Sequence, residues 1–130
     1  MLKHLRWALL WALVILVLCL LPGKDLPEWH WFDLFDLDKL VHAGIFFVLA
    51  LLLAQAFHAA QRPARWALAA CGLTIAYGIG TEVLQGIAGM GRHMDVADMV
   101  ADAIGGCVAV WYARRRVRVG KPVMPVRALR

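Results

Sequence analysis

Four long apolar stretches dominate the pattern of hydrophobic and polar positions along the chain. A membrane-spanning α-helix needs about 20 predominantly apolar residues. Three stretches predict such helices directly, whereas the fourth becomes long enough only if the helix begins near Met94 and includes Asp95, Asp98 and Asp102. The predicted helices cover residues 7–22, 40–60, 66–88 and 94–112.

The amino-acid composition supports a membrane protein. Of the 130 residues, 62% are hydrophobic and 18% are charged, whereas soluble domains have roughly 45–50% apolar residues and about 25% charged residues. A water-soluble domain of this size could not bury so much apolar surface. The sequence therefore predicts an all-α integral membrane four-helix bundle, with residues 1–112 as one transmembrane domain and residues 113–130 as a basic tail.

The first predicted helix follows the basic residues Lys3 and Arg6, as the apolar part of a signal peptide would. No A-x-A cleavage pattern precedes Gly23, and Trp7 and Trp11 are typical anchors at a membrane interface. We therefore interpret this stretch as an uncleaved first span.

Positive charge is distributed unevenly. Segments 1–6, 61–65 and 113–130 hold eleven of the 14 Lys and Arg residues and no acidic residue. Because loops rich in Lys and Arg remain in the cytoplasm, both termini are predicted to be cytoplasmic. The basic tail directly follows a span, which favours anionic membrane lipids over nucleic acid as its partner.

The segment between the first and second predicted helices combines aromatic and acidic residues without a long apolar run. Trp29, Trp31 and Phe32 lie near Glu28 and Asp33. Aromatic side chains concentrate at membrane interfaces, so the segment is predicted to lie along the outer membrane surface.

Small residues recur at every fourth position in two predicted helices. The fourth helix has Ala97, Ala101, Gly105 and Ala109, and the third has Gly72, Ala76 and Gly80. Such rows let helix backbones approach closely. The spacing predicts that the third and fourth helices form a tight hairpin through these rows.

Polar residues gather near the predicted outer ends of helices two, three and four: Asp38, Lys39, His42, Glu82, Gln85, Arg92, Asp95 and Asp98. Asp102 lies deepest in the fourth helix. A carboxylate at the centre of a bilayer costs about 2.5–3.5 kcal/mol on insertion scales. These side chains are therefore predicted to face one another around one pocket, with Arg92 capping it. Glu82 is expected near the membrane surface, where water can contact it, and Asp102 is expected to be structural.

Several of these residues form a recognisable series: Asp38-Lys39-Leu40-Val41-His42, then Glu82-Val83-Leu84-Gln85, Arg92, Asp95-Val96-Ala97-Asp98 and Gly105-Gly106. In order and spacing the series resembles the VanZ-like family of small polytopic bacterial membrane proteins, named for a member linked to teicoplanin resistance. The resemblance implies an inner-membrane protein with a polar site facing the periplasm, and it implies no particular reaction. Asp102 departs from the family, which usually has Asn at this position.

Three functions are compatible with the polar residues. In the first, an enzyme acts at the outer leaflet on a lipid-linked or cell-envelope substrate, with Glu82 and Asp98 as acid and base and His42 as proton carrier. The groups that would bind that substrate are Asp38, Lys39, Gln85, Arg92 and Asp95. In the second, a non-catalytic binding or adaptor protein holds an anionic headgroup, a glycopeptide or another protein. In the third, the charges only hold the helices together. No serine-nucleophile, P-loop or HExxH motif assigns a catalytic class.

A divalent cation is compatible with the first two functions. His42, Glu82, Asp95 and Asp98 offer one nitrogen and several oxygen ligands, a set suited to Mg²⁺, Mn²⁺ or Zn²⁺. The alternative is an internal salt-bridge network without metal. Spacing alone does not decide between them, because the ligands come from three different helices.

Overall fold

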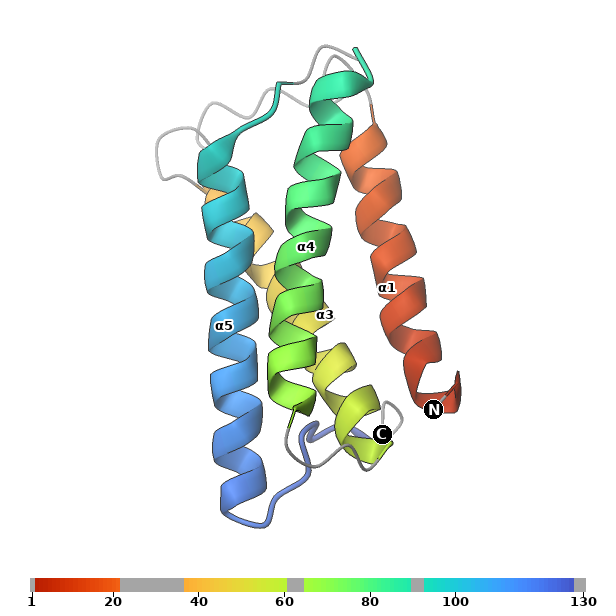
Figure 1. Ribbon diagram of the computed structural model, residues 1–130, viewed down its shortest axis with the longest axis vertical. Coiled ribbons are helices and arrows are strands. Elements are labelled where there is room, and N and C mark those ends of the chain that lie inside the picture. The colour runs from red at the N-terminus through yellow and green to blue at the C-terminus, as the bar shows by residue number, and fades with distance from the viewer. Residues whose placement is uncertain (1, 22–36, 61–64, 90–92, 128–130) are drawn as a thin grey trace.

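The computed structural model describes residues 2–21, 37–60, 65–89 and 93–127, and four α-helices make up most of them (Figure 1). The helices are α1 (Leu2–Leu20), α3 (Leu37–Ala59), α4 (Trp66–Ile87) and α5 (Val96–Arg118). Each is long and apolar enough to cross a membrane, and the described residues contain no strand. The prediction of an all-α protein with four candidate spans is confirmed. The predicted interfacial segment lies within residues 22–36, outside the described residues.

The last helix, α5, ends at Arg118, six residues beyond its predicted end. The prediction stopped at residue 112, where the apolar stretch ends. Arginine is a good helix former, and positive charge is favourable at a helix C-terminus. Gly120 follows with a φ of 70°, a left-handed conformation that glycine adopts without strain and that commonly ends helices.

The chain after α5 returns to the bundle (Figure 1). Val123 and Met124 are buried with the hydrophobic core, and Arg116 Nε donates a hydrogen bond to the Pro122 carbonyl at 2.7 Å. The described part of the basic tail therefore packs against one end of the helices.

The central helix of the bundle is α3, which contacts each of the other helices and packs most extensively against α5. Residues 49–56 of α3 are buried on all sides, as expected for a helix surrounded by others. Apolar side chains also point outward, and Leu68 and Ile87 of α4 are about three-quarters exposed. Such an apolar exterior suits a lipid environment. In Figure 1, α4 lies between α1 and α5, with α3 behind them.

The row of small residues on α5 faces α3 rather than α4. A Cβ atom on Gly105 would overlap the backbone of Ala43 in α3. By contrast, a Cβ atom on Gly72 or Gly80 would have no neighbour within 4 Å, and Ala76 is exposed. The predicted α4–α5 hairpin through these two rows is therefore wrong. A four-residue repeat identifies one face of a helix, but it does not identify which neighbour packs there.

Side-chain hydrogen bonds to backbone carbonyls connect α1 to the bundle. Tyr77 Oη in α4 donates to the Ala12 carbonyl at 2.6 Å, and Trp11 Nε1 donates to the Ile45 carbonyl in α3 at 2.9 Å. Helix α1 packs more against α3 than against α4. The two hydrogen bonds add specific contacts to both neighbours and so help to fix its position.

Candidate functional site

Charged side chains from three helices meet near the end of the bundle where α3 and α5 begin and α4 ends. The group comprises Asp38, Lys39, His42, Glu82, Asp95, Asp98 and Asp102. We call these seven residues the polar cluster. Its members are far apart in the sequence, and the packing of α3 against α4 and α5 brings them together.

The outer part of the polar cluster is organised by one ammonium group. Lys39 Nζ lies 2.6 Å from Asp98 Oδ1, 2.9 Å from Asp95 Oδ2 and 3.2 Å from Asp38 Oδ2. Asp95 is also the N-cap of α5, and its Oδ1 accepts a hydrogen bond from the Ala97 N–H at 2.8 Å. The Lys39 hydrogen bond holds the pKa of the Asp95 carboxyl below its usual range. Lys39 therefore connects α3 to the first turn of α5.

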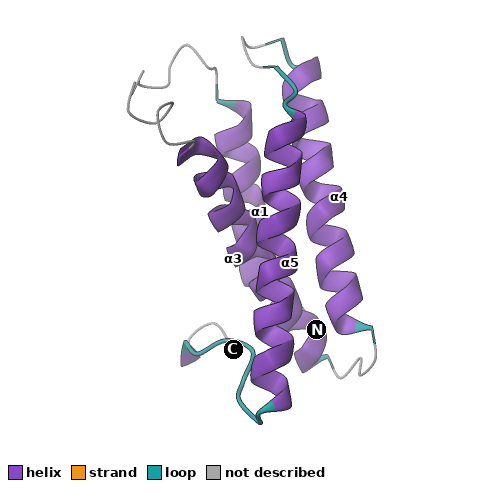
Figure 2. Cartoon of the chain, turned by 90° about the vertical axis from the view of Figure 1, so that its left-hand side faces the viewer, coloured by secondary structure: helices purple, strands orange, loops and turns teal. Residues whose placement is uncertain are grey.

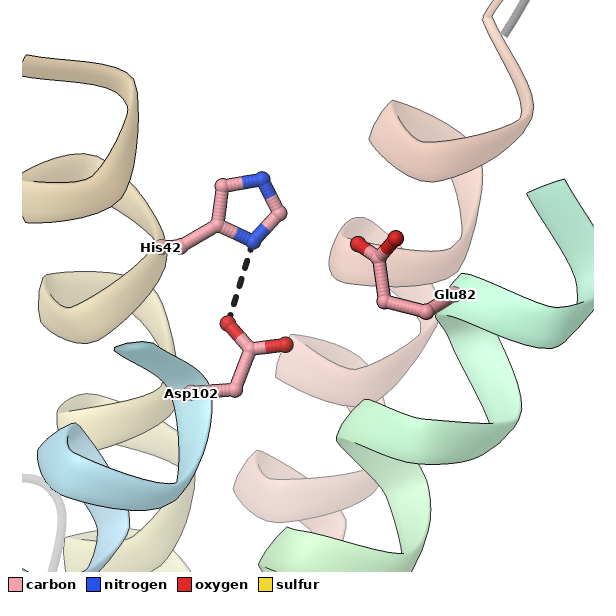
Figure 3. Close-up of side chains that lie close together, drawn as sticks. All are labelled: His42, Glu82 and Asp102. Carbon is pink, nitrogen blue, oxygen red and sulfur yellow. Dashed lines mark hydrogen bonds and ion pairs between the residues drawn. The ribbon is translucent and has the colours of Figure 1, made fainter. Parts of the chain in front are cut away.

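The inner part consists of His42 on α3, Glu82 on α4 and Asp102 on α5 (Figure 3). We call these three residues the inner triad. His42 Nδ1 lies 3.0 Å from Asp102 Oδ1, and a ring nitrogen of His42 and one oxygen from each carboxylate lie within 4.8 Å of one another. The exposed fractions of Glu82 and Asp102 are 0% and 1%. The inner triad is thus enclosed by the three helices.

Among the described residues, each carboxylate of the inner triad has one oxygen with a polar partner and one without. Glu82 Oε2 accepts a hydrogen bond from the Asp95 N–H at 3.1 Å, and Asp102 Oδ1 contacts His42. Across the described part of the chain, no hydrogen-bond donor contacts Glu82 Oε1 or Asp102 Oδ2. Buried polar atoms are nearly always paired, so a proton, a water molecule, a cation or another bound molecule would satisfy these two oxygens.

Two glycines permit the close approach of the helices that carry the inner triad. A Cβ atom on Gly78 of α4 would lie 3.0 Å from Asp102 Cβ and 3.1 Å from its Oδ2. Gly105, three residues after Asp102, lies directly against the Ala43 backbone, next to His42. Because these two positions have no side chain, α4 lies close to Asp102 of α5, and α5 lies close to α3 beside His42.

The structure brings together six of the eight residues that the sequence proposed for the site, namely Asp38, Lys39, His42, Glu82, Asp95 and Asp98. Gln85 is buried, and its Nε2 donates to the Cys19 carbonyl of α1 at 3.1 Å. Arg92 lies outside the described residues. The expectation that water contacts Glu82 is wrong, because Glu82 is buried where α4 meets the N-terminal end of α5.

Asp102 joins the site although the sequence assigned it a structural role. The available signal was its spacing, because Asp98 and Asp102 are four residues apart and share one face of a helix. His42 lies between them, 3.6 Å from Asp98 through Nε2 and 3.0 Å from Asp102 through Nδ1. Of the proposed metal ligands, Asp95 and Asp98 instead bind Lys39.

The arrangement is suited to proton transfer or to cation binding. An imidazole between two carboxylates can exchange a proton with either, and a third carboxylate from Glu82 completes an enclosed acidic group. The same nitrogen and oxygen atoms are ordinary ligands of divalent metal ions.

A comparison with protein families places these observations in context. The sequence model described as VanZ/LLP1 matches residues 7–117, a range that includes α3 and α4, most of α1 and nearly all of α5. No curated protein and no solved structure matches the chain. The match confirms the resemblance carried by residues 38–106, and it covers well over half of the chain. The protein therefore belongs to the VanZ/LLP1 family.

Proposed function

We propose that this protein is a multi-pass protein of the bacterial inner membrane whose polar cluster faces the periplasm and acts on a lipid-linked or cell-envelope substrate. Its cellular role would be envelope modification or tolerance of glycopeptide antibiotics. Membership of the VanZ/LLP1 family supports the envelope context. The polar cluster lies near one end of four apolar helices, so it would lie close to one surface of the membrane.

The observation that carries the proposal is the burial of the inner triad. Ionisable side chains inside a membrane protein are expensive, and they usually mark functional sites. A scaffold that needed charge only to hold its helices together would pair every group, as Lys39 does with its three aspartates. Glu82 and Asp102 each retain a buried oxygen that has no hydrogen-bond partner among the described residues. In the proposed function Glu82 acts as acid or base through His42, whose partly exposed side chain transfers protons to or from the substrate.

The opposite end of the bundle supports the proposed orientation. A groove of about 470 Å³ there is lined by Cys71, Cys107, Val110, Trp111, Arg114, Arg115 and Arg118. Arginines beside an aromatic and apolar surface suit the anionic headgroups of the cytoplasmic leaflet. Because α1 begins and α5 ends at this end of the bundle (Figures 1 and 2), both termini would be cytoplasmic. Reporter fusions after residue 130 and within residues 25–37 should then label opposite sides of the membrane.

The functional test uses His42→Gln and Glu82→Gln in a bacterial host without an outer membrane, with teicoplanin susceptibility and envelope stress as readouts. Expression of the original protein should lower teicoplanin susceptibility, and both variants should abolish this effect at equal membrane abundance. His58→Gln is the matched control, because His58 is exposed near the C-terminal end of α3, away from the polar cluster. Full activity of either cluster variant would contradict the proposal.

A further inference from the structure

We propose that His42, Glu82 and Asp102 bind a divalent transition-metal ion of the zinc or manganese class within the inner triad. The inference rests on the proposed function in one respect, because the ion would occupy the same site. The ligand set also differs from the one that sequence spacing suggested. Asp102 replaces Asp95 and Asp98, which bind Lys39 instead.

The first argument is the convergence of donor atoms. A ring nitrogen from α3 and carboxylate oxygens from α4 and α5 lie within 4.8 Å of one another (Figure 3). Ligands that bind one ion at about 2.1 Å in tetrahedral geometry are separated by about 3.4 Å. The observed spacing is therefore somewhat wider than that of a loaded site.

The second argument is the state of the two carboxylates. Glu82 is oriented through Oε2 by the Asp95 N–H, whereas Asp102 Oδ1 contacts His42 Nδ1, a nitrogen that would carry no proton if it bound the ion. The remaining oxygens, Glu82 Oε1 and Asp102 Oδ2, are buried without a donor among the described residues. A carboxylate that is held by one oxygen and free at the other is the usual arrangement of a metal ligand whose orientation is fixed by its neighbours.

The third argument is charge. Glu82 and Asp102 contribute two buried carboxylates, whereas the His42 side chain remains partly exposed. The Lys39 ammonium lies 2.6 Å from Asp98 and 2.9 Å from Asp95, so it is already paired with the outer carboxylates. A divalent cation would neutralise both inner carboxylates and satisfy both unpaired oxygens, with His42 as a neutral ligand.

The donor set also indicates the class of ion. Mg²⁺ and Ca²⁺ prefer all-oxygen sites, whereas an imidazole nitrogen suits zinc and other transition metals. Three protein ligands leave at least one coordination position for water or substrate, which is typical of catalytic rather than structural zinc sites. The three outer carboxylates, Asp38, Asp95 and Asp98, surround Lys39 and give this outer part of the polar cluster a net negative charge.

The experiment measures metal binding by the purified full-length protein in detergent after treatment with a chelator. Titration with Co²⁺ should produce the visible absorption of a low-coordinate site, and Zn²⁺ should displace it at one ion per chain. Glu82→Gln, Asp102→Asn and His42→Gln should each weaken binding by at least about tenfold. His58→Gln is the matched control: His58 is exposed near the C-terminal end of α3, away from the polar cluster, and this variant should retain binding within about threefold.

Folding is followed separately through the unfolding temperature of the unaltered protein, which Zn²⁺ should raise because the ion binds only the native state. Absence of both Co²⁺ absorption and this rise would overturn the inference. Binding of the metal by Glu82→Gln and Asp102→Asn as tightly as by the unaltered protein would also overturn it. Displacement of Co²⁺ by millimolar Mg²⁺ would do the same. If the metal does not bind but Glu82→Gln still loses the teicoplanin phenotype, only the metal assignment fails. If the metal binds and the phenotype persists, only the proposed function fails.

Discussion

Replacement of Gly105 by alanine tests the α3–α5 contact on which the polar cluster depends. A Cβ atom at this position would lie 2.8 Å from the carbonyl carbon of Ala43 and 2.9 Å from its Cα. Non-bonded carbon atoms prefer separations of about 3.5–4.0 Å. The opposing atoms belong to the backbone and cannot rotate away, so α3 and α5 must separate locally by roughly 1 Å.

The separation would also affect the inner triad. His42 directly precedes Ala43, and Asp102 lies three residues before Gly105, so the 3.0 Å contact between His42 and Asp102 should break. Overpacking costs about 1–3 kcal/mol, and loss of a buried hydrogen bond to a charged group costs about 1–3 kcal/mol. The intrinsic helix preference of alanine over glycine offsets up to about 1 kcal/mol. We expect a net loss of about 2–4 kcal/mol in the free energy of unfolding.

The measurement is reversible unfolding in detergent, with Gly72→Ala and Gly80→Ala as matched controls. Both control positions lie on exposed faces of α4, and a methyl group added at either would have no neighbour within 4 Å. Their stability should remain unchanged or rise by up to about 1 kcal/mol. A Gly105→Ala protein as stable as these controls would refute the close α3–α5 contact.

Three further substitutions test other contacts. Gly78→Ala should displace Asp102 and lower the stability by about 1–2 kcal/mol relative to the same controls, because a methyl group would lie 3.1 Å from Asp102 Oδ2. Lys39→Met should destabilise the protein by about 1–3 kcal/mol in unfolding measurements, because half-buried Asp98 loses its ammonium partner, and a further Asp98→Asn change should restore part of the loss. Tyr77→Phe should cost about 0.5–1.5 kcal/mol and increase proteolysis of α1, because it removes the bond to an α1 carbonyl.

The helices could be predicted because the thickness of a bilayer fixes how many apolar residues a span requires. Three of the four helices follow from hydropathy alone, whereas α5 was found only by including Asp95, Asp98 and Asp102 within or beside it. Its extension to Arg118 was missed because hydropathy measures apolar character and not helical propensity. The return of Val123 and Met124 to the core was also missed, because two isolated apolar residues give no periodic signal.

Part of the polar cluster was predictable for an electrostatic reason. Charges near one end of apolar helices must find partners, so Lys39, His42 and Asp98 were expected to lie close together. The detailed pairing was not predictable, because helical spacing does not fix the rotation of one helix against another. That rotation buries Glu82 and adds Asp102 to the site. It depends on backbone contacts at Gly78 and Gly105, which reveal their partners only in the packed structure.

The close contact between Gly105 and the Ala43 backbone thus lies beside the buried charges of the inner triad. Lys39 pairs with the outer aspartates, which are partly exposed. Asp102 is buried beside the α3–α5 contact, and its Oδ2 has no partner among the described residues. If that contact opens, water can solvate Asp102, and the energetic cost of burying its charge falls. A Gly105→Ala, Asp102→Asn double variant should therefore differ from the sum of the two single changes by about 0.5–3 kcal/mol, as expected for coupled sites. Strict additivity would show that Gly105 supports the fold without influencing the inner triad.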